Sequence, residues 1–137
     1  MTDFVLDCSV AMSWCFEDEG DEYSDRALDA LAKGEAHVPS LWLLEVANVL
    51  ILAERRGRLA EADSTRFVEL LRALPIAMDE EASLQTILTI LARSRAYGLT
   101  SYDAAYLELA MRLGLPLATR DKSLRAACKK SGVKVFK

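Results

Sequence analysis

The sequence predicts an α/β fold in which helices cover both faces of a mostly parallel sheet. Short apolar runs alternate along the chain with longer amphipathic segments, which is the pattern of repeated strand–helix units. The first run, Phe4 to Leu6, is apolar throughout, as in a strand that is buried on both faces. No repeat, low-complexity segment or linker interrupts the 137 residues, so we expect a single domain over residues 1–137.

Further short apolar segments are predicted to be the other strands of this sheet. They are residues 36–38, 75–78, 115–119 and 133–136. Each is bounded by helix-like or turn-forming residues and is too short to be a helix itself. Together with residues 4–6, these segments are the predicted strands of the sheet.

The segments between the strands have helical periodicity and helix-boundary residues. They are residues 10–14, 23–33, 41–56, 61–73, 79–97, 100–113 and 122–130. Ser9 and Ser40 are candidate N-caps, and the acids from Asp79 to Glu81 suit the first turn of the helix that they open. Gly98 and Gly114 are the expected ends of the two helices before them. Residues 17–25 are rich in acids and are predicted to be a solvated loop.

The composition indicates a cytoplasmic protein that makes no membrane contact. Charged residues break every apolar stretch well before the ~20 residues that a membrane span needs, and Asp3 stands where a signal peptide carries basic residues. Cys8, Cys15 and Cys128 have no Cys-x-x-Cys spacing, so we expect small core residues and neither a disulfide framework nor a zinc site.

The formal charge of −4 is unevenly distributed along the chain. Residues 112–137 contain eight Lys or Arg and one acid, a local charge of +7, which leaves −11 for residues 1–111. The basic end could face an anionic polymer such as nucleic acid, or it could be an ordinary solvated helix face.

Four acids are placed where a parallel sheet gathers functional groups. Asp7 and Asp121 each follow an apolar strand, and the carboxyl ends of such strands form the edge at which ligands bind. Glu45 lies in an otherwise apolar helix, and Asp103 lies in the first turn of another. Taken singly, Glu45 could pair with an arginine, and Asp103 could cap its helix or oppose the helix dipole. Taken together, four converging carboxylates need a cation to offset their repulsion.

A divalent metal is the cation that best fits these acids. All-oxygen ligands suit Mg²⁺, or Mn²⁺ as its substitute, and His37 is the only histidine. Attack on a phosphodiester by a metal-activated water is therefore a better fit to this sequence than a mechanism that uses histidine as acid or base. The polar side chains expected to orient carboxylates or water are Ser9, Asn48 and Thr119. The side chains expected to contact substrate phosphates, unless they are simply solvated, are Arg120, Lys122 and Arg125.

Four segments of the sequence resemble the PIN-domain ribonucleases of the VapC toxin type. They read Val-Leu-Asp-Cys-Ser, Pro-Ser-Leu-Trp-Leu-Leu-Glu-Val-Ala-Asn-Val-Leu, Thr-Ser-Tyr-Asp-Ala-Ala-Tyr-Leu-Glu-Leu-Ala and Leu-Ala-Thr-Arg-Asp, and they span nearly the whole chain. The resemblance implies a three-layer α/β/α sandwich, Mg²⁺- or Mn²⁺-dependent endonucleolytic cleavage of RNA, a homodimer and a small VapB-like antitoxin. By motif position it assigns the family's acids to Asp7, Glu45, Asp103 and Asp121. It also implies that the Cys8 side chain points away from the metal.

Two other readings of the same residues are possible. Asp7 could be the phospho-accepting acid of a phosphatase or a receiver domain. However, the phosphatase needs a second acid at the position of Ser9, and the receiver needs one at the position of Cys8. Alternatively, the chain could be a catalytically silent α/β binding module whose acids are structural.

Overall fold

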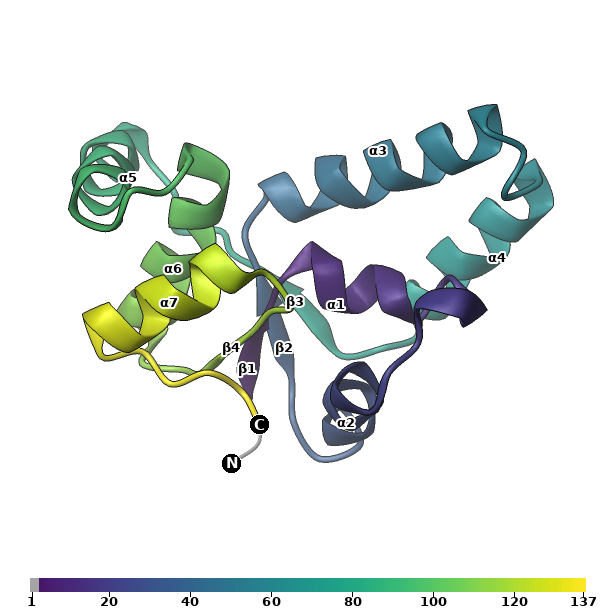
Figure 1. Ribbon diagram of the computed structural model, residues 1–137, viewed down its shortest axis with the longest axis horizontal. Coiled ribbons are helices and arrows are strands. Elements are labelled where there is room, and N and C mark those ends of the chain that lie inside the picture. The colour runs from purple at the N-terminus through teal and green to yellow at the C-terminus, as the bar shows by residue number, and fades with distance from the viewer. Residues whose placement is uncertain (1–2) are drawn as a thin grey trace.

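The computed structural model describes residues 3–137, and it contains a four-stranded parallel sheet with the strand order β3-β2-β1-β4 (Figure 1). The strands are β1 (Phe4–Leu6), β2 (Ala36–Val38), β3 (Ile76–Met78) and β4 (Leu117–Ala118). In the register, Phe4 lies beside Ala36 and Leu6 lies beside Ala118. Because all four strands are parallel, their carboxyl ends meet at one edge of the sheet.

Helices flank the sheet on both sides. They are α1 (Cys8–Ser13), the short 3₁₀ helix η1 (Glu17–Glu19), α2 (Glu22–Ala30), α3 (Leu41–Arg55), α4 (Glu61–Arg72), α5 (Leu84–Tyr97), α6 (Ser101–Leu113) and α7 (Lys122–Ser131). In Figure 1, α6 and α7 lie on one side of the strands and α1 and α2 lie on the other. The predicted α/β architecture is confirmed.

The core explains why the strands are apolar without alternation. The three residues of β1, Phe4, Val5 and Leu6, are completely buried, because α6 packs against one face of the strand and α1 follows on the other side. Cys8 and Cys128 are buried and Cys15 is partly buried; all three thiols are free, as expected for small core residues.

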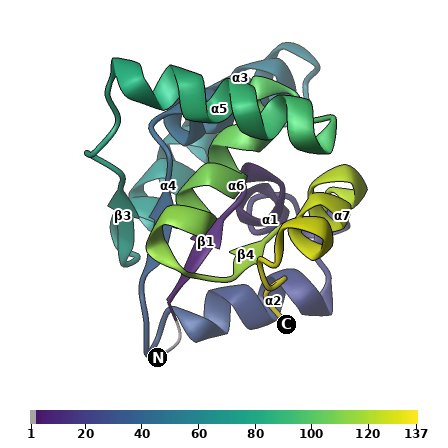
Figure 2. The ribbon, with the colours of Figure 1, turned by 90° about the vertical axis from the view of Figure 1, so that its left-hand side faces the viewer.

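Helices α3, α4 and α5 extend beyond the sheet. Helix α3 runs outward and α4 returns towards the sheet (Figure 1), whereas α5 lies alongside α6 (Figure 2). Gly98 joins α5 to α6 with a positive φ of 64°, a backbone conformation that glycine adopts without steric cost. Within residues 3–137, no helix combines the length and the apolar character needed to cross a bilayer.

Three predicted elements were wrong in extent. Residues 17–25, expected to be a loop, contain η1 and the first residues of α2, because Asp21 caps α2 by accepting the amide of Ser24. Residues 133–136 do not form a strand; a single bridge joins Val135 to Leu117, and its two hydrogen bonds run from the Leu117 amide to the Lys134 carbonyl and from the Phe136 amide to the Leu117 carbonyl. Helix α5 begins at Leu84, so the acids from Asp79 to Glu81 are not its first turn. The amide of Asp79 instead donates to the carbonyl of Val38, which prolongs the pairing of β3 with β2.

Both serines expected as N-caps have other positions. Ser40 has a helical backbone, with φ −57° and ψ −31°, and its side chain makes no capping bond, because the helical turn already starts at Pro39. Ser9 lies inside α1, and the N-cap position belongs to Asp7. The prediction missed this because it treated Asp7 only as the end of a strand.

Candidate active site

Two neighbouring strands deliver acids to the carboxyl edge of the sheet. Asp7 follows β1 directly, and Asp121 follows β4 after two intervening residues. The amide of Asp7 donates to the carbonyl of Ala118 at 3.0 Å, so the two main chains remain paired up to the first acid. Asp7 and Asp121 then occupy the N-cap positions of α1 and α7, where amides and helix dipoles favour negative charge.

Hydroxyl groups hold the two acids in place. Thr119 is fully buried; its hydroxyl donates to Oδ2 of Asp7 at 2.7 Å and accepts the amide of Asp121 at 3.0 Å. The Ser9 hydroxyl donates to the same oxygen of Asp7 at 2.7 Å. Burial raises the pKa of Asp7, and the charge of Asp121 raises it further, whereas the bonds from Thr119 and Ser9 lower it.

Asp103 approaches the same edge from the first turn of α6. The side chain of Thr100 accepts the amide of Asp103 at 3.2 Å, so Thr100 caps the helix and the Asp103 carboxylate does not. Burial raises the pKa of Asp103 to about 6, and the negative charges of Asp121 and Asp7 contribute to the shift. The capping role considered for Asp103 was therefore wrong.

Glu45 enters the site from the middle of α3. Its Oε1 accepts a hydrogen bond from the hydroxyl of Tyr106, which lies on α6 three residues after Asp103. Burial raises the pKa of Glu45, the bond from Tyr106 lowers it, and the charges of Asp7 and Asp103 raise it again. Burial and the bond to Glu45 also raise the pKa of Tyr106, so its hydroxyl stays a neutral donor.

Sequence reasoning missed Tyr106. An aromatic residue in an apolar helix is typical of the core, and Tyr106 is indeed completely buried. The available signal was its spacing from Asp103, because residues three apart lie on the same face of a helix.

The structure brings all four predicted acids to one open cavity of about 600 Å³. The residues that line it are Asp7, Cys8, Ser9, Met12, Glu19, Glu45, Asn48, Val49, Asp103, Arg120 and Asp121. Among residues 3–137, no lysine, arginine or histidine forms an ion pair with any of the four acids. The alternative in which Glu45 pairs with an arginine was therefore wrong.

The chemistry of this cavity fits a hard divalent cation. Its polar lining offers carboxylate and hydroxyl oxygens, which Mg²⁺ and Mn²⁺ prefer. Cys8 also lines the cavity. Burial and the charges of Glu45 and Asp7 raise the pKa of this thiol to about 12, so it stays protonated and is a poor metal ligand.

His37 has partners that its sequence context did not reveal. Its Nε2 lies 3.5 Å from Oδ2 of Asp3 and 3.6 Å from Oε1 of Glu35. In the described part of the chain, this is the one group of three potential ligand atoms within 4.8 Å of one another, so the four acids of the cavity are more widely spaced. The His37 group lies near the amino ends of the strands, away from that cavity.

The three basic residues expected to contact phosphates differ in their surroundings. Arg120 lines the cavity, but its guanidinium pairs with Asp21 at 3.0 Å and donates to the Ser13 hydroxyl at 2.5 Å. Arg125 donates to the carbonyl of Thr119 at 2.7 Å and stacks over Tyr23. Lys122 is exposed.

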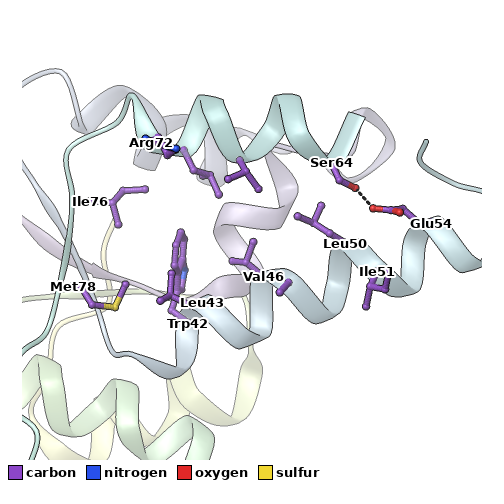
Figure 3. A pocket seen from close by; sticks show the side chains of 13 residues that line it. Trp42, Leu43, Val46, Leu50, Ile51, Glu54, Ser64, Arg72, Ile76 and Met78 are labelled. Carbon is purple, nitrogen blue, oxygen red and sulfur yellow. Dashed lines mark hydrogen bonds between the residues drawn. The ribbon is translucent and has the colours of Figure 1, made fainter. Parts of the chain in front are cut away.

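A second cavity, apolar and about 510 Å³ in volume, lies between α3 and α4 (Figure 3). Trp42, Val46 and Leu50 line it from α3, and Ile76 and Met78 line it from β3. At one end, the hydroxyl of Ser64 donates to Oε2 of Glu54 at 2.6 Å and joins the two helices (Figure 3). We call this cavity the α3–α4 groove.

The fold and the acidic cavity together define a known class of protein. The family model described as PIN domain matches residues 4–130, and the chain belongs to this family. Ribonuclease VapC3 of Pyrobaculum aerophilum is 32% identical over 120 residues, which cover 88% of this chain and 90% of that protein. This likeness places the chain among the VapC-type members of the family.

Solved structures share this fold. The crystal structure of PAE2754 from Pyrobaculum aerophilum superposes with a TM-score of 0.68 at 25% identity, covering 91% of this chain and 85% of that one. A toxin-antitoxin complex from Klebsiella pneumoniae has a similar fold, with a TM-score of 0.64 at 19% identity and 90% of both chains covered.

Proposed function

We propose that this protein is a Mg²⁺- or Mn²⁺-dependent endoribonuclease that hydrolyses RNA phosphodiester bonds and acts as the toxin of a toxin–antitoxin pair. The observation that carries the proposal is the cavity in which Asp7, Glu45, Asp103 and Asp121 lie together, with no basic side chain of residues 3–137 paired to them. Membership of the PIN domain family and the likeness to a VapC ribonuclease support it. Because its substrate is RNA, we expect the protein to act in the cytoplasm.

The four carboxylates would hold the metal, and the neighbouring groups would position them. When bound, a divalent cation lowers the pKa of water and stabilises negative charge on phosphate oxygens. Ser9 and Thr119 both donate to Oδ2 of Asp7 and so fix the orientation of this carboxylate. Asn48 lines the cavity, where its amide can orient water or RNA.

The basic residues near Asp121 would guide the RNA backbone. The uneven charge of the chain places its excess of Lys and Arg after residue 111, on the side of β4 and α7. Lys122 is free to contact a phosphate, whereas Arg120 would have to exchange its pairing with Asp21 for one. Arg125 contributes mainly by holding the Thr119 carbonyl.

The test is cleavage of total RNA with Mn²⁺, with EDTA, and by the Asp7→Asn variant. We expect cleavage with Mn²⁺, none with EDTA, and a loss of about 100-fold or more in Asp7→Asn, which removes a charge at the buried centre of the site. Glu80→Gln removes an exposed acid outside the cavity and should cleave like the wild type.

Several results would contradict the proposal. Cleavage that survives EDTA or Asp7→Asn would exclude the metal mechanism. Phosphate release from a small phosphomonoester without RNA cleavage would favour the phosphatase reading, and a folded protein that neither cleaves RNA nor binds Mn²⁺ would favour the silent binding module.

The α3–α4 groove supports the antitoxin part of the proposal. It is apolar, open and about 510 Å³ in volume, which suits an amphipathic segment of a partner laid against it. The structural neighbour from Klebsiella pneumoniae is itself a toxin-antitoxin complex. We therefore expect a small VapB-like protein encoded next to this gene to bind here.

Binding of this neighbouring gene product can be compared between two variants of α4. Val68 is 40% exposed and lines the groove, so Val68→Asp should weaken binding about 10-fold or more in calorimetry. Leu70 is 47% exposed on the same helix but lies outside the groove, so Leu70→Asp is the matched control. Equal affinities for both variants would place the partner elsewhere.

A homodimer is also part of the proposal. Helix α5 has no buried residue, although it carries Leu84, Ile87 and Leu88, which are between 55% and 84% exposed. Leu44 on α3 is 75% exposed. Apolar surface of this extent is typical of an interface, and a second copy of the chain is the partner that we propose for it.

A further inference from the structure

The hydroxyl of Tyr106 makes one hydrogen bond, and its acceptor is a candidate metal ligand. Tyr106 is completely buried, and its ring belongs to the core. A phenylalanine would fill the same space, and a buried hydroxyl destabilises a fold unless it finds a partner. The hydroxyl is therefore explained by its bond to Oε1 of Glu45 and by nothing else in residues 3–137.

The same face of α6 supplies both Asp103 and this hydroxyl. Asp103 and Tyr106 are three residues apart, so one lies a turn beyond the other on the helix. Among the described residues, the bond from Tyr106 to Glu45 is the hydrogen bond that joins α6 to α3. It therefore fixes the position of one acid of the cavity relative to another.

The Glu45 carboxylate has no other hydrogen-bond donor in the described chain. Its side chain leaves the middle of a helix whose other side faces the α3–α4 groove, and without the hydroxyl it would be free to change rotamer. A neutral donor holds the carboxylate without cancelling its charge. An arginine in this place would offset the charge that attracts a cation.

We propose that Tyr106 is a positioning residue for the metal site: its hydroxyl fixes Oε1 of Glu45 so that Oε2 faces the cavity and is free for a divalent cation or its water. The inference rests on the proposed function and adds a residue outside the four acids and their adjacent hydroxyls. Tyr106 touches neither the cation nor the RNA; it acts through Glu45.

The experiment uses calorimetry to measure the affinity of the full chain for Mn²⁺ in the absence of RNA. Tyr106→Phe keeps the ring and removes only the hydroxyl, so we expect a folded protein whose Mn²⁺ affinity is lower by about 10-fold or more. At saturating Mn²⁺ its RNA cleavage should return towards the wild-type rate. Tyr97→Phe, which removes a hydroxyl at the end of α5, is the control and should bind Mn²⁺ like the wild type.

A double-variant cycle shows whether Tyr106 acts through Glu45. In a Glu45→Gln background, Tyr106→Phe should cause little further loss of Mn²⁺ affinity. Glu45→Asp keeps the charge but withdraws the carboxylate from the hydroxyl, so it should weaken binding by a similar factor even if Tyr106→Phe fails to fold.

Unchanged Mn²⁺ affinity in Tyr106→Phe or in Glu45→Asp would overturn the inference. It would also be overturned if Tyr106→Phe lowered the Mn²⁺ affinity by the same factor in the wild type and in the Glu45→Gln background. A lower melting temperature with unchanged affinity would mean that Tyr106 is purely structural. If the wild type itself binds no Mn²⁺, the proposed function fails instead, so the two failures can be told apart.

Discussion

The side chain of Thr119 makes two hydrogen bonds at the buried centre of the acidic cavity. It donates to Asp7 and accepts the amide of Asp121, so one hydroxyl sets the spacing between the two acids that follow strands. The residue has no exposed surface, which means that water cannot replace either bond.

Replacing Thr119 by valine should therefore harm both stability and metal binding. Thr119→Val keeps the shape but leaves the Asp121 amide unpaired, so we expect the free energy of unfolding to fall by about 1–3 kcal/mol. Mn²⁺ affinity should fall about 10-fold or more, because Asp7 loses one of two orienting donors. Urea unfolding and calorimetry measure the two effects. Thr65→Val, at an exposed site on α4, should change neither.

The raised pKa of Asp103 gives the metal-free protein a particular pH dependence. The folded protein holds this proton up to about pH 6, whereas an ordinary aspartate loses it near 3.8. Between those values the folded state binds more protons than the unfolded state, so stability falls as the pH rises. The pKa values of Asp7 and Glu45 are raised as well and act in the same direction.

We expect Asp103→Asn to be more stable than the wild type at pH 7 in EDTA, because the variant removes a charge that its neighbours repel. The advantage should shrink as the pH falls towards about 4, where the carboxyl is protonated and uncharged in the folded wild type. Urea unfolding at pH values between about 4 and 7 measures the difference in the free energy of unfolding between Asp103→Asn and the wild type. A difference that stays constant with pH would show that the carboxylate is not destabilised by its surroundings.

At the scale of elements, Arg112 on α6 forms ion pairs with the loop that connects β3 to α5. Its guanidinium lies 2.7 Å from Asp79, 3.1 Å from Glu81 and 2.8 Å from Glu108. The bond to Arg112 lowers the pKa of Asp79. These acids look like a helix N-terminus in the sequence, but they act as the anchor of a loop, because their partner lies about thirty residues further on.

Arg112→Met keeps most of the apolar stem but leaves three neighbouring carboxylates without their cation. We expect the free energy of unfolding to fall by about 1–3 kcal/mol, since Asp79 and Glu108 are largely buried. Arg66→Met removes a surface pair with Asp63 whose arginine is 76% exposed, and it should cost less than about 0.5 kcal/mol. Similar losses in both variants would contradict the anchoring role.

At the scale of the whole molecule, the exposed leucines of α5 and α3 predict self-association. The wild type should elute at twice the 15.2 kDa of one chain when its mass is measured by light scattering. Leu88→Asp places a charge in the middle of the exposed apolar row of α5 and should shift the mass to that of a monomer. Leu70→Asp, on the far helix α4, should leave the mass unchanged. A monomeric wild type would refute the homodimer.

The sequence by itself determined the α/β class, the strand that carries Asp7, and the choice of four acids. These follow from local signals: an apolar run without alternation, an acid directly after it, and helices ended by glycine. It also indicated Ser9 and Thr119 as supports for the carboxylates, and both hydroxyls contact Asp7 in the structure.

Only the tertiary structure decided which long-range partners these residues have. Tyr106 meets Glu45 across 61 positions and Thr119 meets Asp7 across 112, and no local pattern specifies such pairs. The same applies to Arg112, which turned a predicted helix start into an anchored loop, and to residues 133–136, whose pairing stops at one bridge. Hydrophobic periodicity records which residues are buried, whereas the packing of helices on the sheet decides which polar atoms meet.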